Sequence, residues 1–405
     1  MPIIAICNRP SKEIWRRSDD RMKNQENDTL GCGNFDMKRV VIAHPSPDLY
    51  GSDRMVLESV RAVANTHRVL FILPADGPLA DRLKEVGAEI MIMPTPVLRK
   101  SLLSPSGLLT LAWRTLTVLP RMVALLRRQR PIALYVNTIT IPLWIVAGRL
   151  ARVRVVCHAH EAEQYLPSLM RRLLTAPVRL AHHVVANSDV CLRTLVGAGV
   201  SGDRVSVVYN GVPDHDEVKP PREAPQGRLV VVGRLSPRKG CDVAVRAVAL
   251  LRARGRDVTL TLVGSVFPGY EWFEEQLRDL AGDGVVFAGF QDPVTPFVDD
   301  ADIVLVPSYG ESFGNVAVEA MLAERPVVAS DVQGLDEIIQ TGRTGLLIPP
   351  GDPQALAAAV ESLLDDWPHA LDLARSGRNA ACERFAIARY HSDIVRVLSA
   401  PIASA

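Results

Sequence analysis

The sequence predicts an α/β protein with two doubly wound domains, each a parallel sheet covered by helices on both faces. From residue 39 onward, short apolar runs alternate with longer amphipathic segments. Continuous apolar runs of this kind are typical of parallel strands that are buried on both faces. A stretch rich in proline and charge interrupts the alternation after residue 213, and the alternation then restarts. At 405 residues the chain is also long enough for two hydrophobic cores.

The N-terminal 37 residues differ from everything that follows. They are polar, charged and aperiodic, which is typical of disorder, and an apolar strand begins directly after Met37. We interpret residues 1–37 as a disordered tail or a mis-assigned start, and favour a true start at Met37. They contain no apolar signal-peptide core, so we expect no secretory signal. No apolar run reaches the roughly 18 residues of a spanning helix, because Arg114, Pro120 and Arg121 interrupt the best candidate.

Two series of apolar runs define the expected domains. The first domain is placed at 38–213, with expected strands RVVIAH, RVLFIL, EIMIM, ALYVN, RVVCHA, HVVAN and RVSVV. The second is placed at 228–383, with expected strands LVVVGR, VTLTLVG, VVFAGF, DIVLVPS, RPVVAS and GLLIPP. Residues 214–227 are the expected linker, and an amphipathic helix is expected at 384–399. Such sheets bind ligands at the carboxyl ends of their strands, and most of the unusual residues fall there.

The bulk composition excludes several classes of function. A formal net charge of +1 and a charged fraction of 22% give no general attraction to nucleic acid. The six cysteines are scattered without any C-x-x-C pair, which argues against a disulfide framework or a zinc site. We therefore expect a protein of the reducing cytoplasm.

The segment VVGRLSPRKG, residues 231–240, suits a diphosphate. A strand runs into Gly233, and Arg234 and Lys239 follow it. Glycine allows the backbone to approach a phosphate closely, and the two cations neutralise its charge. A surface turn with solvated basic residues has about equal weight when the segment is taken alone. The spacing is not a dinucleotide fingerprint, because G-x-G-x-x-G is absent.

The segment PSYGESFGNVAVEA, residues 307–320, follows another expected strand and carries two glutamates. We expect residues 312–315 to form the first turn of a helix, whose free N–H groups suit a phosphate or a sugar. Glu319 lies about one turn further in and can lean back toward the ribose diol of a nucleotide. Glu311 precedes the helix in a loop facing the cleft. Acids near a helix N-terminus are common, and this alternative explains Glu311 better than Glu319.

Two further segments in the first half are candidate ligand contacts. VVCHAHEAEQ places His158 and His160 at a strand end, where a histidine can donate to a substrate hydroxyl. No third metal ligand is evident, and His158 also fits a structural role. Gly51 stands near an expected helix start, an arrangement that suits an anion but is equally typical of an ordinary strand-to-helix turn.

The segment 99–154 is strongly basic. No acidic residue occurs between Glu89 and Glu161, whereas ten basic residues do, interleaved with apolar stretches. Basic amphipathic helices can lie on an anionic membrane, and a solvated helix face is the equally weighted alternative.

Taken together, these motifs resemble the retaining glycosyltransferases of the GT-B fold, specifically glycosyltransferase family 4, over roughly residues 39–397. The resemblance is carried by VVGRLSPRKG, the E-x7-E pair, VVYNGVP, TGLLIPPGD and ANSDVCLRTL in this order. It implies two Rossmann-like domains that face each other across a cleft, with the final helix 384–399 crossing back onto the first domain. Glu324 departs from the pattern, because the family often has glycine there.

The resemblance implies a role for each motif. Arg234 and Lys239 would bind the nucleotide diphosphate, Glu319 the ribose and Glu311 the transferred sugar. His160 would contact the sugar near the reacting carbon, and Gly51 would belong to the phosphate-side loop. The backbone amides near the helix start would contact sugar and phosphate; the residues assigned to this group are Ser312, Phe313, Gly314, Asn315 and Val316. No metal and no cofactor would be required beyond the donor substrate.

The expected function is that of a metal-independent retaining hexosyltransferase acting on a nucleotide diphosphate-sugar. The acceptor would be a lipid-linked or saccharide hydroxyl in envelope polysaccharide or glycolipid synthesis. We expect a cytoplasmic protein, peripheral on the inner face of the membrane through segment 99–154, with no nucleic-acid partner. The alternatives are a sugar-nucleotide epimerase of the same fold and a non-catalytic nucleotide-sugar-binding protein. A glycoside hydrolase with paired carboxylates fits less well, because Glu311 and Glu319 flank a phosphate-type helix start.

Overall fold

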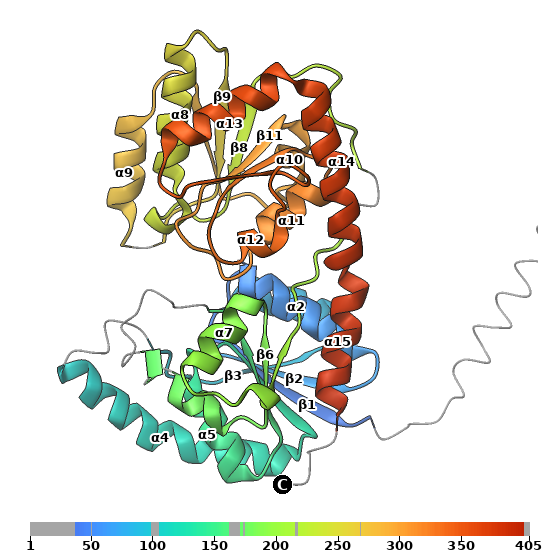
Figure 1. Ribbon diagram of the computed structural model, residues 1–405. Coiled ribbons are helices and arrows are strands. Elements are labelled where there is room, and N and C mark those ends of the chain that lie inside the picture. The colour runs from blue at the N-terminus through green and yellow to red at the C-terminus, as the bar shows by residue number, and fades with distance from the viewer. Residues whose placement is uncertain are drawn as a thin grey trace, which may run out of the picture. The chain divides into compact units, whose positions relative to one another are not determined.

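The computed structural model describes residues 37–49, 51–98, 105–161, 171–172, 175–214, 218–267 and 269–400 (Figure 1). The tail expected at 1–37 lies outside the described residues except for Met37. Residues Arg39–Ala405 form one compact unit that contains two parallel sheets.

The first sheet has seven strands in the order β3-β2-β1-β4-β5-β6-β7, and its strand pairs are parallel. This is the order of a doubly wound sheet, and its direction reverses between β1 and β4. β4 and β5 are buried along their whole length, which explains why they are continuous apolar runs. The strands are β1 (Arg39–Ala43), β2 (Arg68–Leu73), β3 (Glu89–Ile92), β4 (Ala133–Asn137), β5 (Val155–Ala159), β6 (His183–Ala186) and β7 (Val205–Val207).

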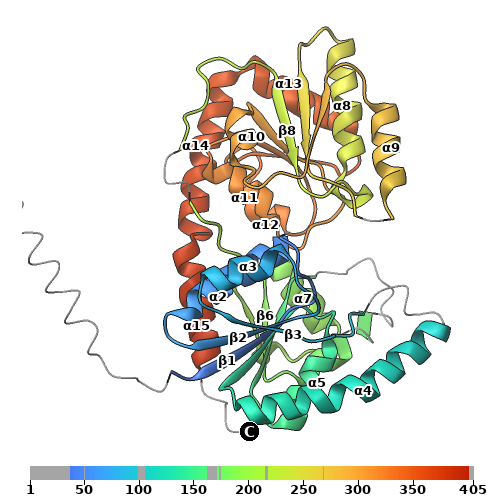
Figure 2. The same ribbon diagram turned by 180° about the vertical axis from the view of Figure 1, so that it is seen from behind.

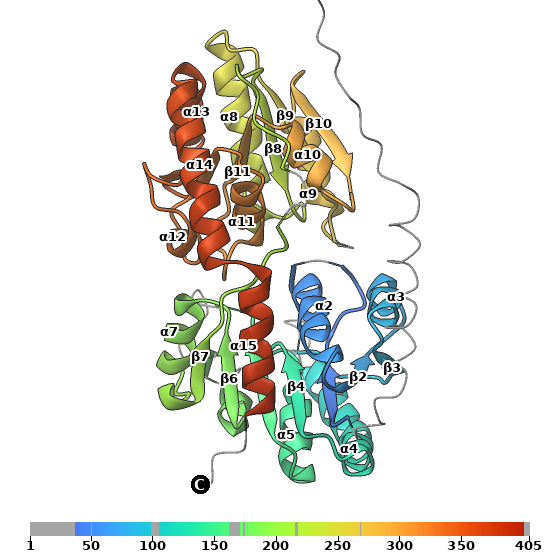
Figure 3. The same cartoon turned by 90° about the vertical axis from the view of Figure 1, so that its right-hand side faces the viewer.

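Helices cover both faces of the first sheet (Figure 2). One apolar cluster joins the sheet to α4 (Pro105–Gln129), α5 (Pro142–Ala151) and α7 (Asp189–Gly197). The opposite cluster joins it to α2 (Gly51–Ala64), α3 (Pro78–Glu85) and the last helix, α15 (Ile387–Ser399). α15 packs against α2, and its Tyr390 hydroxyl lies 2.7 Å from the Ser59 hydroxyl (Figure 3).

The second sheet repeats the same plan with six strands in the order β10-β9-β8-β11-β12-β13. Its pairs are again parallel, and its direction reverses between β8 and β11. The strands are β8 (Arg228–Val232), β9 (Thr259–Val263), β10 (Val285–Gly289), β11 (Ile303–Val306), β12 (Val327–Ser330) and β13 (Leu346–Ile348).

Two apolar clusters also flank the second sheet. One contains residues of α8 (Cys241–Ala253), α9 (Glu271–Leu280) and α13 (Pro353–Asp365). The other contains residues of α10 (Thr295–Asp300), α11 (Asn315–Leu322), α12 (Leu335–Ile338) and α14 (Trp367–Arg384). α14 ends at Arg384, three residues before α15 begins. Among the described helices, none is long and apolar enough to cross a membrane.

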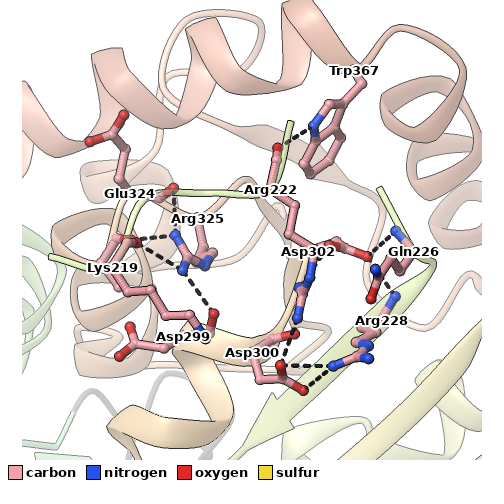
Figure 4. A network of polar contacts seen from close by, with 11 residues as sticks. Lys219, Arg222, Gln226, Arg228, Asp299, Asp300, Asp302, Glu324, Arg325 and Trp367 are labelled. Atoms are coloured by element: carbon pink, nitrogen blue, oxygen red, sulfur yellow. Dashed lines mark hydrogen bonds and ion pairs between the residues drawn. The ribbon is translucent and has the colours of Figure 1, made fainter. Parts of the chain in front are cut away.

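The segment 218–227 has no regular secondary structure, yet it is held firmly against the second sheet (Figure 4). Arg222 donates to both Asp300 and Asp302, and Trp367 Nε1 donates to the Arg222 carbonyl at 2.9 Å. The Asp302 carboxylate accepts from the backbone amides of Gln226 and Arg228, at 2.7 and 2.8 Å. The carboxylates of Asp300 and Asp302 therefore serve this anchoring.

Arg325 sits at the centre of a second set of bonds in the same region (Figure 4). Its side chain is buried, with 2% exposure, and its guanidinium donates to the carbonyls of Lys219, Asp299 and Ala323 at 2.8–3.0 Å. Burial lowers the pKa of Arg325 from its usual value. A buried guanidinium needs such acceptors, because an unpaired charge in the interior is costly.

The sequence prediction of the fold class is confirmed: the apolar runs expected as strands form β1 to β13 in two doubly wound sheets. One local expectation was wrong. Residues 312–314 do not form a helical turn, and α11 begins only at Asn315. Gly314 precedes the helix with φ 121°, and a Cβ atom there would lie 2.6 Å from the Leu335 side chain. This left-handed residue turns the chain immediately before the helix.

Candidate functional site

A cavity of about 390 Å³ opens where strand ends of the second sheet meet the start of α2. The ends of β8 and β9 contribute Gly233 and Gly264 to its lining. The predicted site residues that line it are Gly51, Arg234, Asn315, Val316 and Glu319. The cavity thus brings together residues that the sequence separates by more than 260 positions.

Two helix N-termini face each other at this cavity. α2 begins at Gly51 and α11 begins at Asn315. A Cβ atom at Gly51 would lie 3.8 Å from the Asn315 amide nitrogen, so the two helix starts are close together. The first N–H groups of a helix have no partner within it, and the helix dipole is positive at this end. The arrangement therefore favours an anionic ligand.

Glycine is required where the β8 and β9 loops meet beside the cavity. Gly264 has φ 147°, and a Cβ atom on it would lie 1.9 Å from the Gly233 carbonyl oxygen. That separation is impossible for non-bonded atoms, so the two backbones can approach only without a side chain at residue 264. The sequence motif predicted a close backbone approach at Gly233. In the structure Gly264 is also needed for it, which the motif did not reveal.

Arg234 lines the cavity and is held by an aromatic ring. Its guanidinium carbon lies 3.1 Å from the centroid of the Phe267 ring. A guanidinium stacked on an aromatic face retains its charge and fixes its direction. Arg234 is thus suited to hold an anion in a defined orientation.

Lys239 and Glu311, the other predicted charged residues, form an ion pair with each other. Lys239 belongs to the short 3-10 turn η5 (Pro237–Lys239), and its aliphatic stem lies near Gly233. The Ser308 hydroxyl donates to Glu311 at 2.9 Å, and the Arg238 guanidinium lies 3.6 Å from the second carboxylate oxygen. Neither Lys239 nor Glu311 lines the cavity itself.

The Glu311 carboxylate is kept ionised by its neighbours. Its side chain is only 8% exposed, and this burial acts to raise its pKa. The charges of Lys239 and Arg238 and the hydrogen bonds from Lys239 and Ser308 outweigh burial, so the pKa of Glu311 lies below its usual value. A carboxylate in this state accepts hydrogen bonds and does not act as an acid near neutral pH.

The remaining predicted residues of this loop have different environments. Ser312 is half-buried, and the Phe313 ring is buried, with centroids 6.0 Å from Tyr209 and 5.4 Å from Phe385. This ring therefore serves to fix the loop. The loop is also supported from Gly334, where a Cβ atom would lie 2.7 Å from the Phe313 carbonyl oxygen.

His160 does not line the cavity. It follows β5, it is 9% exposed, and its Nε2 lies 2.9 Å from the Asn137 side-chain oxygen. Burial, followed by the proximity of His44, lowers the pKa of His160 to about 3. The ring is therefore neutral over the physiological range.

The neighbouring His158 is fully buried, and its Nδ1 hydrogen-bonds the Tyr135 hydroxyl. Burial, followed by the proximity of His160, lowers its pKa well below the usual value. Among the described residues, no group of three His, Cys, Asp or Glu side chains could hold a metal ion.

Sequence reasoning missed several residues at the site. Arg54 of α2 and Asp292, in the loop after β10, line the cavity and form an ion pair at 2.9 Å. The Asn210 side-chain amide donates to the Asn315 side-chain oxygen at 2.8 Å and so fixes the start of α11. A charged residue on an amphipathic helix carries no signal for such a long-range partner, so Arg54 was not predictable. Asn210 lies within VVYNGVP, a segment that had been singled out only for its resemblance.

Comparison with known families agrees with this geometry. Residues 50–216 match the family described as Glycosyltransferase Family 4, and residues 226–366 match the domain described as Glycosyl transferases group 1. The two matches together span most of the chain. This chain belongs to glycosyltransferase family 4. The family resemblance predicted from the sequence is therefore confirmed.

Curated relatives of this family 4 chain are similar over about half of their length. A D-inositol 3-phosphate glycosyltransferase of Acidothermus cellulolyticus is 34% identical over 250 residues, covering 56% of this chain and 55% of the relative. A glycogen synthase of Mycobacterium tuberculosis is 31% identical over 246 residues, covering 59% of this chain and 55% of the relative. The chain thus spans about half the length of the curated relatives it matches.

Solved structures share the fold over nearly the whole family 4 chain. HepE of Anabaena, in complex with UDP and glucose, has a TM-score of 0.78 at 23% identity and covers 90% of this chain and all of that one. Sucrose-phosphate synthase from Thermosynechococcus elongatus has a TM-score of 0.69 at 20% identity, covering 89% and 98%. At these identities the likeness establishes the GT-B fold.

Proposed function

We propose that this chain transfers a sugar from a nucleotide diphosphate-sugar to a hydroxyl acceptor, with retention of the anomeric configuration. One observation carries the proposal: the N-termini of α2 and α11 lie at the same cavity, and Arg234 and Glu319 line it as well. Family membership supports a glycosyltransferase, and the Anabaena structures with UDP, glucose and UDP-glucose support a donor of this class.

In the proposed complex, the diphosphate binds Arg234 and the N-terminus of α11, and the Glu319 carboxylate accepts from the ribose hydroxyls. Glu311 and His160 contact the transferred sugar. Lys239 lies within reach of both Glu311 and the Gly233 loop, so its ammonium completes the positive side of the site. These fixed charges stabilise the departing phosphate without reorganising during the reaction.

The transfer step makes one bond and breaks one bond on the same face of the sugar. The anomeric carbon loses its bond to the phosphate oxygen and gains a bond to the acceptor oxygen, while the acceptor proton passes to the departing phosphate. A double displacement requires a carboxylate nucleophile. Glu311 does not suit this role, because it is engaged by Lys239, Ser308 and Arg238. We propose that the reaction is metal-independent, since cations and helix dipoles supply the positive charge.

The decisive experiment is a donor screen with UDP-, GDP- and dTDP-sugars, read by thermal shift and by product mass. A true donor at 100 times its Kd should stabilise the protein by about 2.7 kcal/mol. Transfer to an acceptor with an unchanged anomeric configuration, insensitive to EDTA, is the expected result. Conversion of the donor without an acceptor would instead identify an epimerase. Binding without any turnover over a broad acceptor panel would identify a non-catalytic binding protein.

We further propose a lipid-linked or saccharide acceptor of envelope polysaccharide or glycolipid synthesis, at the inner face of the cytoplasmic membrane. The support is α4, which exposes Trp113 and Leu116 to solvent at 70% and 72% together with the basic Arg121, Arg127 and Arg128. An exposed apolar and basic helix is suited to an anionic lipid surface.

Fewer basic residues of segment 99–154 can be assigned to a membrane-facing surface in the structure than the sequence suggested. Arg154 is buried and donates to the Leu398 carbonyl, so it cannot face a membrane. Arg99, Lys100 and the side chain of Arg114 lie outside the described residues. Charge reversal of Arg127 and Arg128 should reduce sedimentation with anionic liposomes. Equal sedimentation of the reversed and unchanged proteins, or none by either, would contradict the membrane proposal.

A further inference from the structure

A continuous chain of buried hydrogen bonds runs across the carboxyl ends of β1, β4 and β5. His44 directly follows β1, and its Nε2 lies 2.7 Å from the carboxylate of Asp53, which belongs to the first turn of α2. His44 Nδ1 lies 2.9 Å from the Asn137 side-chain nitrogen, and the Asn137 side-chain oxygen lies 2.9 Å from His160 Nε2. The exposed fractions of the four residues lie between 0% and 9%.

Each bond in this chain dictates the direction of the next one. A carboxylate can only accept, so His44 donates from Nε2 to Asp53. The Asn137 NH2 group can only donate, so His44 Nδ1 accepts from it and carries no proton. Once the NH2 group faces His44, the Asn137 oxygen faces His160, and His160 must donate from Nε2. A neutral imidazole carries a single ring proton, so Nδ1 of His160 has none.

We propose that Asp53, His44 and Asn137 form a positioning chain that fixes the proton of His160 on Nε2 and leaves its Nδ1 as a hydrogen-bond acceptor. The sequence suggested that this histidine would donate to a substrate hydroxyl. The geometry assigns the opposite role to its side chain: Nε2–H is committed to Asn137, and Nδ1 accepts from a hydroxyl of the ligand. This use on a sugar hydroxyl rests on the proposed function, whereas the tautomer itself rests on the geometry alone.

The surroundings of His160 agree with a neutral ring. The His158 ring centroid lies 4.0 Å away, and His160 is only 9% exposed. Burial lowers the pKa of His160 to about 3. A second proton on the ring is therefore disfavoured, and a single tautomer suffices to describe it near neutral pH.

The tautomer can be measured in the unliganded wild-type protein with ¹⁵N-labelled histidine. Long-range ¹H–¹⁵N spectra separate the ring nitrogens, because Nε2 couples through two bonds to both ring carbon protons. His160 and His44 should each show a protonated Nε2 and an unprotonated Nδ1, with signals assigned by their loss in H160Q and H44Q. A proton on Nδ1 of His160, or an imidazolium at either residue, would overturn the proposal.

Substitutions at Asn137 separate positioning from packing. Asn137→Asp retains an acceptor toward His160. Asn137→Leu keeps the volume but removes the acceptor. We expect the Nε2–H signal of His160 to persist in N137D and to shift and exchange rapidly in N137L. A packing role predicts the reverse, because a buried strand position tolerates leucine better than an added charge. Thr194→Val, which removes a buried hydrogen bond to the Val190 carbonyl within α7, is the control and should leave the signal unchanged.

Activity measurements then test whether the positioning chain of Asp53, His44 and Asn137 contributes to sugar transfer. N137L should lower kcat/KM for sugar transfer about 10- to 100-fold, which corresponds to one lost hydrogen bond to a buried partner. Affinity for the nucleoside diphosphate alone should not change, and N137D should restore much of the activity. An equal loss in both variants would overturn the positioning role. If the wild type shows the tautomer but transfers no sugar, the proposed function fails and the tautomer assignment stands.

Discussion

Replacing Glu311 by glutamine tests the charge balance beside the cavity most directly. The substitution preserves shape but removes the charge that faces Lys239 and Arg238. Exposed ion pairs contribute up to about 1 kcal/mol, whereas breaking a buried pair costs about 3–5 kcal/mol. The side chains here are 8% and 20% exposed for Glu311 and Lys239, which is close to the buried limit. We therefore expect E311Q to lower the free energy of unfolding by about 2–3 kcal/mol.

The expected loss depends on pH in a defined direction. The folded-state pKa of Glu311 is lowered, so its stabilisation is fully present above the unfolded pKa of about 4.3. It disappears as the pH falls through the lower folded-state pKa. The difference between wild type and E311Q should thus be constant near neutral pH and should narrow only below about pH 4.

A double-mutant cycle with Lys239→Met supplies the measurement. Calorimetric Tm values are recorded for the wild type, E311Q, K239M and the double variant, with E361Q as a control at a more exposed carboxylate. At about 2–4 °C per kcal/mol, E311Q should melt about 4–12 °C lower. A coupling below about 0.5 kcal/mol between the two substitutions would refute the reasoning, because the pair would then be screened by solvent.

Three further predictions concern the second sheet. Arg325→Leu removes the donor to three buried carbonyls, so it should lower the free energy of unfolding by about 3–5 kcal/mol in urea titrations. Arg343→Leu, at an exposed position, is the control and should change it little. Glu324 has φ 55° just after α11, so Glu324→Gly should stabilise by up to about 1 kcal/mol, and a loss above 1 kcal/mol would contradict this. Glu319→Gln should weaken nucleotide binding by calorimetry about 10- to 100-fold, and unchanged affinity would remove Glu319 from the site.

The sequence was sufficient for the sheets because strand burial has a local signature. Each run of β-branched and aliphatic residues is a strand, and the order of the strands follows from the doubly wound pattern. The glutamate pair was recognisable by spacing, although the beginning of α11 was misplaced. The reason for that error is Gly314, whose φ is positive and where the Leu335 side chain, twenty-one residues later, leaves no room for a Cβ atom.

The positioning chain illustrates what local patterns cannot provide. His44, Asn137 and His160 each follow or end an apolar strand, so each one carried a weak signal. Their meeting depends on the adjacency of β1, β4 and β5 in the sheet, which joins residues more than 90 positions apart. Glu324 is the opposite case, because the sequence alone showed that it departs from the family pattern. Its left-handed backbone explains why glycine is common at this position.

The anchored segment 218–227 also sets where this chain can be recombined with a relative. Because Arg222, Gln226 and Arg325 bind this segment to the second sheet, a chimera cut within it would combine mismatched partners. Asp214 is likewise paired with Arg378 of α14, so the upstream junction belongs between Pro213 and Asp214. The downstream junction belongs at Ala386, because α15 packs on the first sheet and must come from the same parent. The exchangeable module is therefore residues 214–386, inserted between two pieces of one host.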